Sequence, residues 1–336
     1  MTMRALLVRE PGAIELAEVA DPVPGAEEVL VRPTLVGICG TDVDIVDGRV
    51  DPLFIRYPMV LGHEWTGVVA EPGRGGLAAG TRVVVEGIVP CGRCTACAAG
   101  ATNRCDTYDE LGFTRYGAAA ELVRAPAHLV HPLAPQVSEE SAVLTEPASV
   151  VFTGLSRVSP VPGWRVLVIG DGTIGLLAAR LAHLWSPSEV TLLGRRTEQA
   201  GLAASAGADQ FTVDTEAVPA GHFDLVVEAA GSAAAVRTAF AAVRRGGVVL
   251  LLGYLGGPPG AELPVDDVVN GDLTIAGSFG YTRTAWRRVV DLLNAGSVDL
   301  GFLVTHRFPL QAYAAAFAAL REGSGSRAKV ALIPAG

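Results

Sequence analysis

The sequence predicts an α/β protein built from two unlike parts. Its 336 residues are too many for one ordinary hydrophobic core, half of them are hydrophobic, and 40 are glycines, which suits many tight turns. Short β segments separated by Pro and Gly turns fill the first part, whereas strands and helices alternate from Pro160 onward. Such alternation indicates a doubly wound parallel sheet.

The first part contains β segments and one helix. Pairs such as Pro11-Gly12 separate the predicted strands, which cover residues 4–9, 29–36, 59–71, 81–89 and 117–132. A helix is predicted over 138–158, with Ser138 as its N-cap and acidic residues in its first turn. Glu146 would lie inside this helix, beside a proline that distorts it locally.

The second part begins with a strand over 165–169 and a glycine-rich turn. A helix follows whose apolar residues recur at positions 174, 177, 181 and 184. The turn is a G-x-G-x-x-G motif between strand and helix, where backbone N–H groups and the helix N-terminus receive a dinucleotide pyrophosphate. The candidate cofactor contacts are Gly170, Gly172, Thr173, Ile174 and Gly175.

Later elements complete the parallel sheet and then return to the first part. Strands at 190–193, 224–228 and 248–252 alternate with helices that end near residues 206 and 243. Beyond Asp272 we expect a strand, a helix over 283–294, and short β segments at 301–308 and 328–333 around a helix over 310–322. These last segments are expected to rejoin the first domain.

The end of the second strand of the parallel sheet indicates the cofactor. NAD-binding proteins carry Asp or Glu there, which bonds the ribose hydroxyls. This chain has Arg195 and Arg196 instead, and two guanidinium groups match a 2′-phosphate. Paired arginines in a loop are often merely solvated, but their position opposite a missing acid favours NADP.

Four of the five cysteines form a compact cluster with the spacing C-x2-C-x2-C-x7-C. Four thiolates at this spacing can close a tetrahedral shell around zinc with no open position, which makes a structural site. An iron–sulfur cluster, a redox thiol switch and unligated thiols are the alternatives. The four residues are Cys91, Cys94, Cys97 and Cys105.

A second set of metal-ligand types is spread along the first part. Cys39 lies between glycines in the segment 37–42, so a tight turn can present its sulfur. His63 and Glu64 follow a strand, and Glu146 lies further along. Thiolate, imidazole and carboxylate are zinc ligands, and a catalytic site uses three of them with one position open. A buried free cysteine and a hydrogen-bonded core histidine are the alternative.

Charge and hydropathy exclude several classes of protein. The net charge of −9 argues against nucleic acid or an anionic membrane surface as the main partner. No apolar run approaches the ~20 residues of a membrane span. The first ten residues read as a strand without a signal peptide's cleavage region. We therefore expect a cytoplasmic protein, in which cysteines serve as metal ligands or thiols more often than as disulfides.

Taken together, these motifs resemble the zinc-dependent medium-chain dehydrogenase/reductase family, the alcohol dehydrogenase-like proteins. The resemblance covers essentially the whole chain, with its motifs in family order at 37–42, 62–64, the four-cysteine lobe, Glu146-Pro147 and 170–175. It implies a GroES-like catalytic domain formed by residues 1–157 and 296–336. A Rossmann NADP-binding domain, residues 158–295, would be inserted between these two segments, with a cleft between the domains.

The resemblance also implies roles for individual residues. Cys39, His63 and Glu146 would hold a catalytic zinc, with Glu64 as a possible exchange ligand and Asp42 orienting the site. Thr41 would relay the alcohol proton outward, toward the cofactor ribose or Asp44. The cysteine lobe would hold a second zinc, giving two per subunit.

Smaller features indicate which branches of the family the chain resembles most. The Glu-Pro pair at 146–147 is similar to that of polyol, threonine and glucose dehydrogenases. Asp44 and the arginine pair resemble NADP-using glucose dehydrogenases, and the segment 110–115 resembles aminocyclitol dehydrogenases.

The resemblance implies an oxidoreductase that moves hydride between NADP(H) and a secondary alcohol or ketone. The expected substrate is a polyhydroxylated small molecule, such as a sugar, cyclitol or aminocyclitol. Alternatives are a ketoreductase of a less polar biosynthetic intermediate, a zinc-bearing enoyl or quinone reductase, and a non-catalytic NADPH-binding sensor. The protein is expected to form a homodimer or homotetramer.

Overall fold

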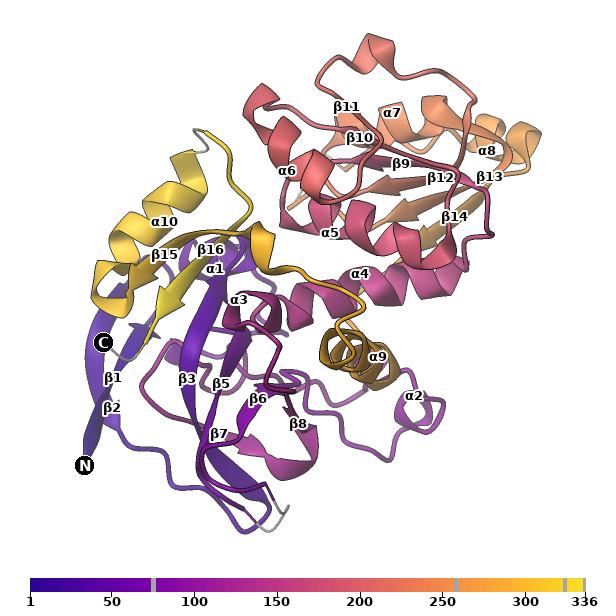
Figure 1. Cartoon of the computed structure of the whole chain (residues 1–336). Helices are drawn as coiled ribbons and strands as arrows, with labels where there is room; N and C mark the ends of the chain where they lie inside the picture. Colours follow the sequence, from indigo (N-terminus) through magenta and orange to yellow (C-terminus); the bar gives the residue numbers. More distant parts are fainter. Residues whose placement is uncertain (74–76, 257–259, 323–324, 335–336) are drawn as a thin grey trace. The chain divides into compact units, whose positions relative to one another are not determined.

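A computed structural model describes residues 1–73, 77–256, 260–322 and 325–334 (Figure 1). The chain divides into two compact units. The first comprises Met1–Glu146, Thr282–Ser324 and Lys329–Gly336, and the second comprises Pro147–Tyr281 and Gly325–Ala328. Two sheets of mainly antiparallel strands form the first unit and a parallel sheet forms the second, which confirms the predicted fold class.

Two sheets build the first unit. A three-stranded antiparallel sheet has the order β2-β1-β4, with β1 at Thr2–Val8, β2 at Ile14–Ala20 and β4 at Met59–Val60. The larger sheet has the order β15-β16-β3-β5-β6-β8, and β7 also pairs with β3. Its strands are β3 (Glu28–Ile38), β5 (Glu64–Glu71), β6 (Arg82–Val85), β7 (Val123–Pro126), β8 (Val130–Pro132), β15 (Val304–Pro309) and β16 (Lys329–Ile333).

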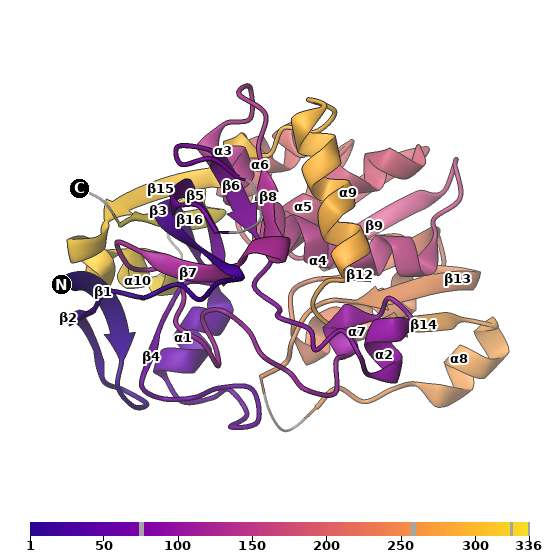
Figure 2. The ribbon, with the colours of Figure 1, turned by 90° about the horizontal axis from the view of Figure 1, so that it is seen from below.

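Alternating side chains of these strands form the core of the first unit. Val29 and Val31 of β3, Trp65 and Val69 of β5, and Val83 of β6 are all buried in one hydrophobic cluster. The helix α10 (Tyr313–Glu322) lies against β15 and β16, as Figures 1 and 2 show. The remaining helices are α1 (Gly40–Val46), α2 (Thr95–Ala98), α3 (Glu139–Ala142) and α9 (Arg283–Asn294), with short 3₁₀ turns at Thr102–Arg104, Ala127–Leu129, Gly301–Leu303 and Leu310–Ala312.

The predicted strand over 59–71 is broken, and the break carries a candidate site residue. β4 ends at Val60 and β5 begins at Glu64, so His63 lies in the connecting turn. Gly62 makes this turn with a φ of +104°, and a Cβ there would lie 2.6 Å from the Ala119 nitrogen. The predicted strand over 117–132 is likewise two short strands, β7 and β8.

The helix predicted over 138–158 consists of two helices. Ser138 caps α3 as predicted, since its Oγ accepts the Ser141 N–H at 3.1 Å. The helix α4 then runs over Thr145–Val158. Pro147 lies in its first turn, where a backbone N–H would have no intrahelical partner in any case, so the expected local distortion is not required.

The predicted domain boundary near residue 295 is displaced in the structure. The helix α9 was expected in the second domain but belongs to the first unit. Arg283 donates its backbone N–H to Thr102 Oγ1 at 3.0 Å and its guanidinium to the His128 carbonyl at 2.8 Å. Asn294 Oδ1 accepts the Ala134 N–H at 2.8 Å. Hydrogen bonds at both ends therefore tie this helix to the first unit.

The second unit is a six-stranded parallel sheet with the order β11-β10-β9-β12-β13-β14. This is the order of a doubly wound nucleotide-binding sheet, with β9 at the point where the strand order reverses. The strands are β9 (Arg165–Ile169), β10 (Glu189–Leu193), β11 (Gln210–Thr212), β12 (Phe223–Glu228), β13 (Val243–Leu251) and β14 (Thr274–Gly277).

Helices alternate with the strands of this sheet along the chain. They are α5 (Thr173–Ala182), α6 (Ala200–Ser205), α7 (Ala233–Ala242) and α8 (Val265–Gly271), with 3₁₀ turns at His183–Trp185, Thr197–Gln199 and Thr215–Ala217. The inner face of α5 is buried, including Leu177 and Leu181. Leu184, predicted on the same face, lies beyond the end of α5 and is 39% exposed. No helix in the described parts of the chain is long and apolar enough to span a membrane.

Candidate functional site

Cys39 lies at the junction of β3 and α1, where it caps the helix. Its Sγ accepts the Thr41 N–H at 3.3 Å, and its own N–H donates to Asp42 Oδ2 at 2.9 Å. A Cβ on Gly37 would lie 2.5 Å from Glu64 Oε2 and 3.2 Å from Lys329 Cδ, so the packing of these two buried side chains favours a glycine. Gly40 has open space around it and no left-handed φ, so the expected need for a second glycine is not supported.

His63 faces Cys39 with one ring nitrogen and Asp42 with the other. Nε2 lies 3.2 Å from Cys39 Sγ, and Nδ1 lies 3.5 Å from Asp42 Oδ1. Burial lowers the pKa of His63, but the negative Asp42 and Cys39 raise it more, and the result is well above the ordinary value. Because the Asp42 carboxylate lies beside Nδ1 of His63, Nε2 is left to face the Cys39 sulfur.

Glu64 forms a buried ion pair with Lys329 on β16. The Lys329 ammonium contacts Glu64 Oε2, and both side chains are almost inaccessible to water. Burial lowers the pKa of Lys329, whereas the Glu64 carboxylate and the Cys39 sulfur raise it above its usual range. The lysine was not predicted as a site residue. The available signal was a single charged side chain in the otherwise apolar strand sequence 328–333.

The structure brings Cys39, His63 and Glu64 together as a possible metal site. One ligand atom from each lies within 4.8 Å of the others. Around a tetrahedral zinc, a sulfur and a nitrogen ligand would lie about 3.6 Å apart, close to the 3.2 Å between Cys39 Sγ and His63 Nε2. The donor set and its spacing therefore fit zinc.

Glu146, expected as the third ligand, interacts electrostatically with Glu64 and His63 but is not part of this group. Burial, together with the nearby Glu64 carboxylate, raises the pKa of Glu146 to about 8. Glu110 also interacts electrostatically with Glu146 and with His63. Burial raises the pKa of Glu110 to about 7. Glu110 was named from the sequence only within the segment 110–115, which resembles aminocyclitol dehydrogenases. The structure adds its carboxyl group to those of Glu64 and Glu146.

Thr41 and Asp44 lie on α1, after Cys39. The Thr41 side chain is half-buried in the first turn of the helix. Asp44 Oδ1 accepts from Arg49 Nε at 2.9 Å and from Nη2 at 2.6 Å. Among the described contacts, none joins Asp44 to the Cys39 and His63 side chains.

The four remaining cysteines converge in a lobe around α2. Their sulfur atoms all lie within 4.8 Å of one another, against the ~3.8 Å expected between thiolates around a tetrahedral zinc. Cys94 caps α2 by accepting the Cys97 N–H at 3.4 Å, and Cys105 Sγ accepts the Cys91 N–H at 3.3 Å. Backbone N–H groups lower the pKa of Cys91 to about 6, whereas burial raises that of Cys97 to about 12. The lobe therefore fits a closed, four-thiolate metal shell.

The predicted fingerprint forms the turn between β9 and α5. Gly170 has a φ of +123°, and a Cβ on Gly175 would lie 1.8 Å from the Gly170 carbonyl oxygen, so both positions require glycine. Gly172 is the N-cap of α5 and has open space where a side chain would be. The first N–H groups of α5, at Thr173, Ile174 and the following residues, thus have no side-chain cap from Gly172, which fits a pyrophosphate.

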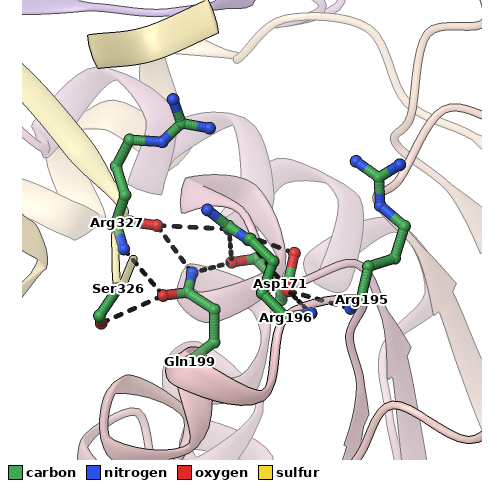
Figure 3. Close-up of polar contacts among 6 residues, drawn as sticks. All are labelled: Asp171, Arg195, Arg196, Gln199, Ser326 and Arg327. Atoms are coloured by element: carbon green, nitrogen blue, oxygen red, sulfur yellow. Dashed lines mark hydrogen bonds and ion pairs between the residues drawn. The ribbon is translucent and has the colours of Figure 1, made fainter. Parts of the chain in front are cut away.

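The two arginines after β10 have different environments (Figure 3). Arg195 is exposed, and within the described residues its guanidinium has no hydrogen-bond or ion-pair partner. Arg196 directs Nε and Nη2 to Asp171, the middle residue of Gly170-Asp171-Gly172, with distances of 3.3 Å to the carboxylate oxygens. Burial raises the pKa of Asp171, but the backbone N–H of Arg195 and the Arg196 guanidinium lower it below its ordinary value.

Two family models match almost the whole chain. The alcohol dehydrogenase GroES-like domain matches residues 25–135, and the glucose dehydrogenase C-terminus matches residues 139–325. The chain belongs to the zinc-dependent medium-chain dehydrogenase/reductase family. It is an oxidoreductase of the alcohol dehydrogenase type, and the predicted family is confirmed.

Several family members are similar over their full length. An L-threonine 3-dehydrogenase of Streptomyces coelicolor is 34% identical over 97% of this chain and 98% of its own. A sorbitol dehydrogenase of Halalkalibacterium halodurans is 29% identical over 99% of both chains. A zinc-binding dehydrogenase of Sinorhizobium meliloti, crystallised with NADP, has a TM-score of 0.92 at 28% identity, covering 99% of this chain and 100% of its own.

Proposed function

We propose that this protein is an NADP(H)-preferring, zinc-dependent dehydrogenase that interconverts a secondary alcohol and a ketone of a polyhydroxylated substrate. The observation that carries the proposal is the group of Cys39, His63 and Glu64, whose ligand atoms converge within 4.8 Å. A non-catalytic NADPH sensor has no use for this group. A homodimer or homotetramer remains part of the proposal.

The positions of the two glutamates favour Glu64, and not Glu146 as expected, as the carboxylate ligand of zinc. Glu64 already lies with Cys39 and His63, and Glu146 lies outside that group. We therefore assign Cys39 Sγ, His63 Nε2 and a Glu64 oxygen to zinc, with Glu146 as the exchange ligand. Lys329 contacts Glu64 Oε2, so a shift of this contact would accompany the exchange.

The chemistry of the site combines a metal, a cofactor and protein groups. Zinc bound there would supply a Lewis acid for the substrate oxygen, and a nicotinamide cofactor would supply the hydride acceptor or donor. Thr41 Oγ1, on the helix that begins after Cys39, relays the substrate proton, and Asp44 is the outer acid of that path. Asp42 orients His63 through Nδ1. The cysteine lobe holds a second zinc with a structural role.

Acidic side chains around the site support a polar substrate. Glu110 and Glu146 are buried or half-buried carboxyl groups that interact electrostatically with each other and with His63. Such groups bond vicinal hydroxyls or an ammonium and are left unpaired by a plain alkanol. The names of the similar threonine and sorbitol dehydrogenases agree with a substrate of this class.

The substrate class is tested by kcat/KM with NADP across matched series of polyols, amino-alcohols and simple alkanols. We expect polyols or amino-alcohols to exceed butanol by at least about a hundredfold, since unpaired buried polar groups discriminate by this order. Higher efficiency on alkanols would contradict the polar site and favour a less polar intermediate as substrate. Absence of turnover with every series would favour the sensor.

A further inference from the structure

Six residues of the second unit form one polar network beside the fingerprint turn (Figure 3). They come from three segments: the turn after β9, the loop after β10, and the segment Gly325–Ala328, which precedes β16. The residues are Asp171, Arg195, Arg196, Gln199, Ser326 and Arg327.

Gln199 joins the last of these segments to the first. Its side chain is fully buried, and its Oε1 accepts the Arg327 N–H at 2.9 Å and the Ser326 hydroxyl at 3.2 Å. Its Nε2 donates to the Arg327 carbonyl at 2.7 Å and to the Asp171 carbonyl at 2.6 Å. Every polar atom of the Gln199 amide therefore helps to hold the Arg327 backbone beside the fingerprint turn.

Arg196 is held in place by the same turn and retains one unused donor. Its Nε and Nη2 face Asp171, and Nη2 also lies 3.4 Å from the Arg327 carbonyl oxygen. Its Nη1 is buried and has no hydrogen-bond partner among the described residues. A buried guanidinium N–H without an acceptor is unfavourable, so this atom indicates a ligand oxygen.

The network has an excess of positive charge. It holds three guanidinium groups and the single carboxylate of Asp171. Burial lowers the pKa of Arg327, and so does the nearby Arg196, because two neighbouring cations repel each other. Figure 3 shows the guanidinium groups of Arg195 and Arg327 extending toward the same side of the network, upward in this view.

A ribose phosphate matches this charge better than a ribose diol does. A phosphate monoester carries about −1.5 to −2 charges at neutral pH, with several acceptor oxygens. An unmodified ribose needs an acid that accepts its hydroxyls. The carboxylate of the network, Asp171, is occupied, because its Oδ2 accepts the N–H groups of Arg195 and Arg196 at 3.0 Å each.

We propose that Arg327 is a specificity-determining residue for the 2′-phosphate of NADP, acting with Arg195 and the free Nη1 of Arg196. This inference rests on the NADP preference proposed above and adds a cation from a segment 131 residues away from Arg196. Gln199 is the positioning residue, because it fixes the Arg327 backbone and contributes no charge of its own.

The test measures binding and does not depend on turnover. Dissociation constants of 2′,5′-ADP and 5′-AMP, and of NADPH and NADH, are measured by calorimetry for wild type and Arg327→Gln. We expect R327Q to weaken 2′,5′-ADP and NADPH by about tenfold to a hundredfold, the range of one charge-assisted hydrogen bond. Binding of 5′-AMP and NADH should change by less than about twofold, which also shows that the variant is folded. Arg321→Gln, which removes an exposed arginine of α10, is the matched control and should change none of the four.

The outcomes separate this inference from the proposal on which it rests. If wild type binds NADPH no more tightly than NADH, the NADP preference is wrong and the inference fails with it. If wild type prefers NADPH and R195Q loses that preference while R327Q keeps it, only the Arg327 assignment is wrong. Equal weakening of all four ligands in R327Q would place Arg327 at a group that both cofactors share, and would also overturn the assignment.

The role of Gln199 is tested by a double-mutant cycle. Gln199→Ala should weaken NADPH more than NADH, because it releases the Arg327 backbone. In the R327Q background the same substitution should change the ratio of NADPH to NADH affinity by less than about twofold, since the positioned cation is already absent. An equal effect of Q199A on that ratio in both backgrounds would show that Gln199 does not act through Arg327.

Discussion

At the scale of single residues, the two adjacent arginines after β10 should contribute differently to cofactor binding. Arg195→Gln removes an exposed guanidinium that has no partner within the described residues, so we expect KM for NADPH to rise about tenfold and KM for NADH to stay constant. Arg196→Gln leaves Asp171 without its ion-pair partner in the fingerprint turn and also removes Nη1, so NADH should bind more weakly and NADPH more weakly still. Steady-state kinetics with each cofactor measure this difference, and the same NADPH-selective effect in both variants would contradict it.

Lys329 offers a second prediction at this scale. Lys329→Met removes one partner of a buried ion pair and leaves the Glu64 carboxylate alone, which typically costs about 3–5 kcal/mol. The free energy of unfolding of the zinc-free protein, measured with denaturant, should fall by this order. The double variant K329M/E64Q removes both charges and should recover much of the loss. A single variant as stable as wild type would show that the pair is not formed in solution.

At the scale of elements, a substitution at Cys94 in the cysteine lobe can distinguish helix capping from metal binding. Cys94 caps α2 through its sulfur, and serine also accepts a backbone N–H at an N-cap. Cys94→Ser should therefore keep the cap while removing one thiolate from the four-sulfur shell. We expect the zinc content to fall by about one ion per chain and the thermal unfolding midpoint to fall with it. A variant that retains its full zinc content would show that the lobe is not a metal shell.

Local motifs could be predicted from the sequence, and long-range partners could not. The four cysteines span a short segment, and the fingerprint glycines lie between one strand and the next helix, so their spacing alone specified how they come together. Lys329 and Glu64 are 265 residues apart, and Gln199 and Arg327 are 128 apart. Only the pairing of β16 with β3 and the return of the segment Gly325–Ala328 to the second unit bring these partners together.

Domain boundaries were predicted less well than the helices and strands themselves, because they also depend on long-range contacts. The limits of β9 and α9 agree with the predicted strand and helix, because their hydrophobic patterns are clear. The assignment of α9 to the second domain was wrong, since that depends on hydrogen bonds of Arg283 and Asn294 with residues far away in sequence. Which of Glu64 and Glu146 lies with Cys39 and His63 likewise depends on distances that sequence spacing does not contain.

At the scale of the whole molecule, the first unit carries the metal-ligand groups and the second carries the fingerprint and the arginine network. In the proposed function, metal-assisted activation of a substrate oxygen and selection of a phosphorylated cofactor would therefore belong to separate units. Substitutions in one set should leave binding to the other intact. Cys39→Ser should bind NADPH as tightly as wild type does, and R327Q should contain as much zinc as wild type does.

The central claim is that Cys39, His63 and a carboxylate hold a catalytic zinc distinct from the zinc of the cysteine lobe. Its most direct test is the zinc content per chain of wild type and of Cys39→Ser, determined by elemental analysis, with NADPH binding as the check that the variant is folded. The account predicts two zinc ions per chain in wild type and one in C39S. Equal zinc content in the two proteins, or a single metal ion per chain in wild type, would contradict it.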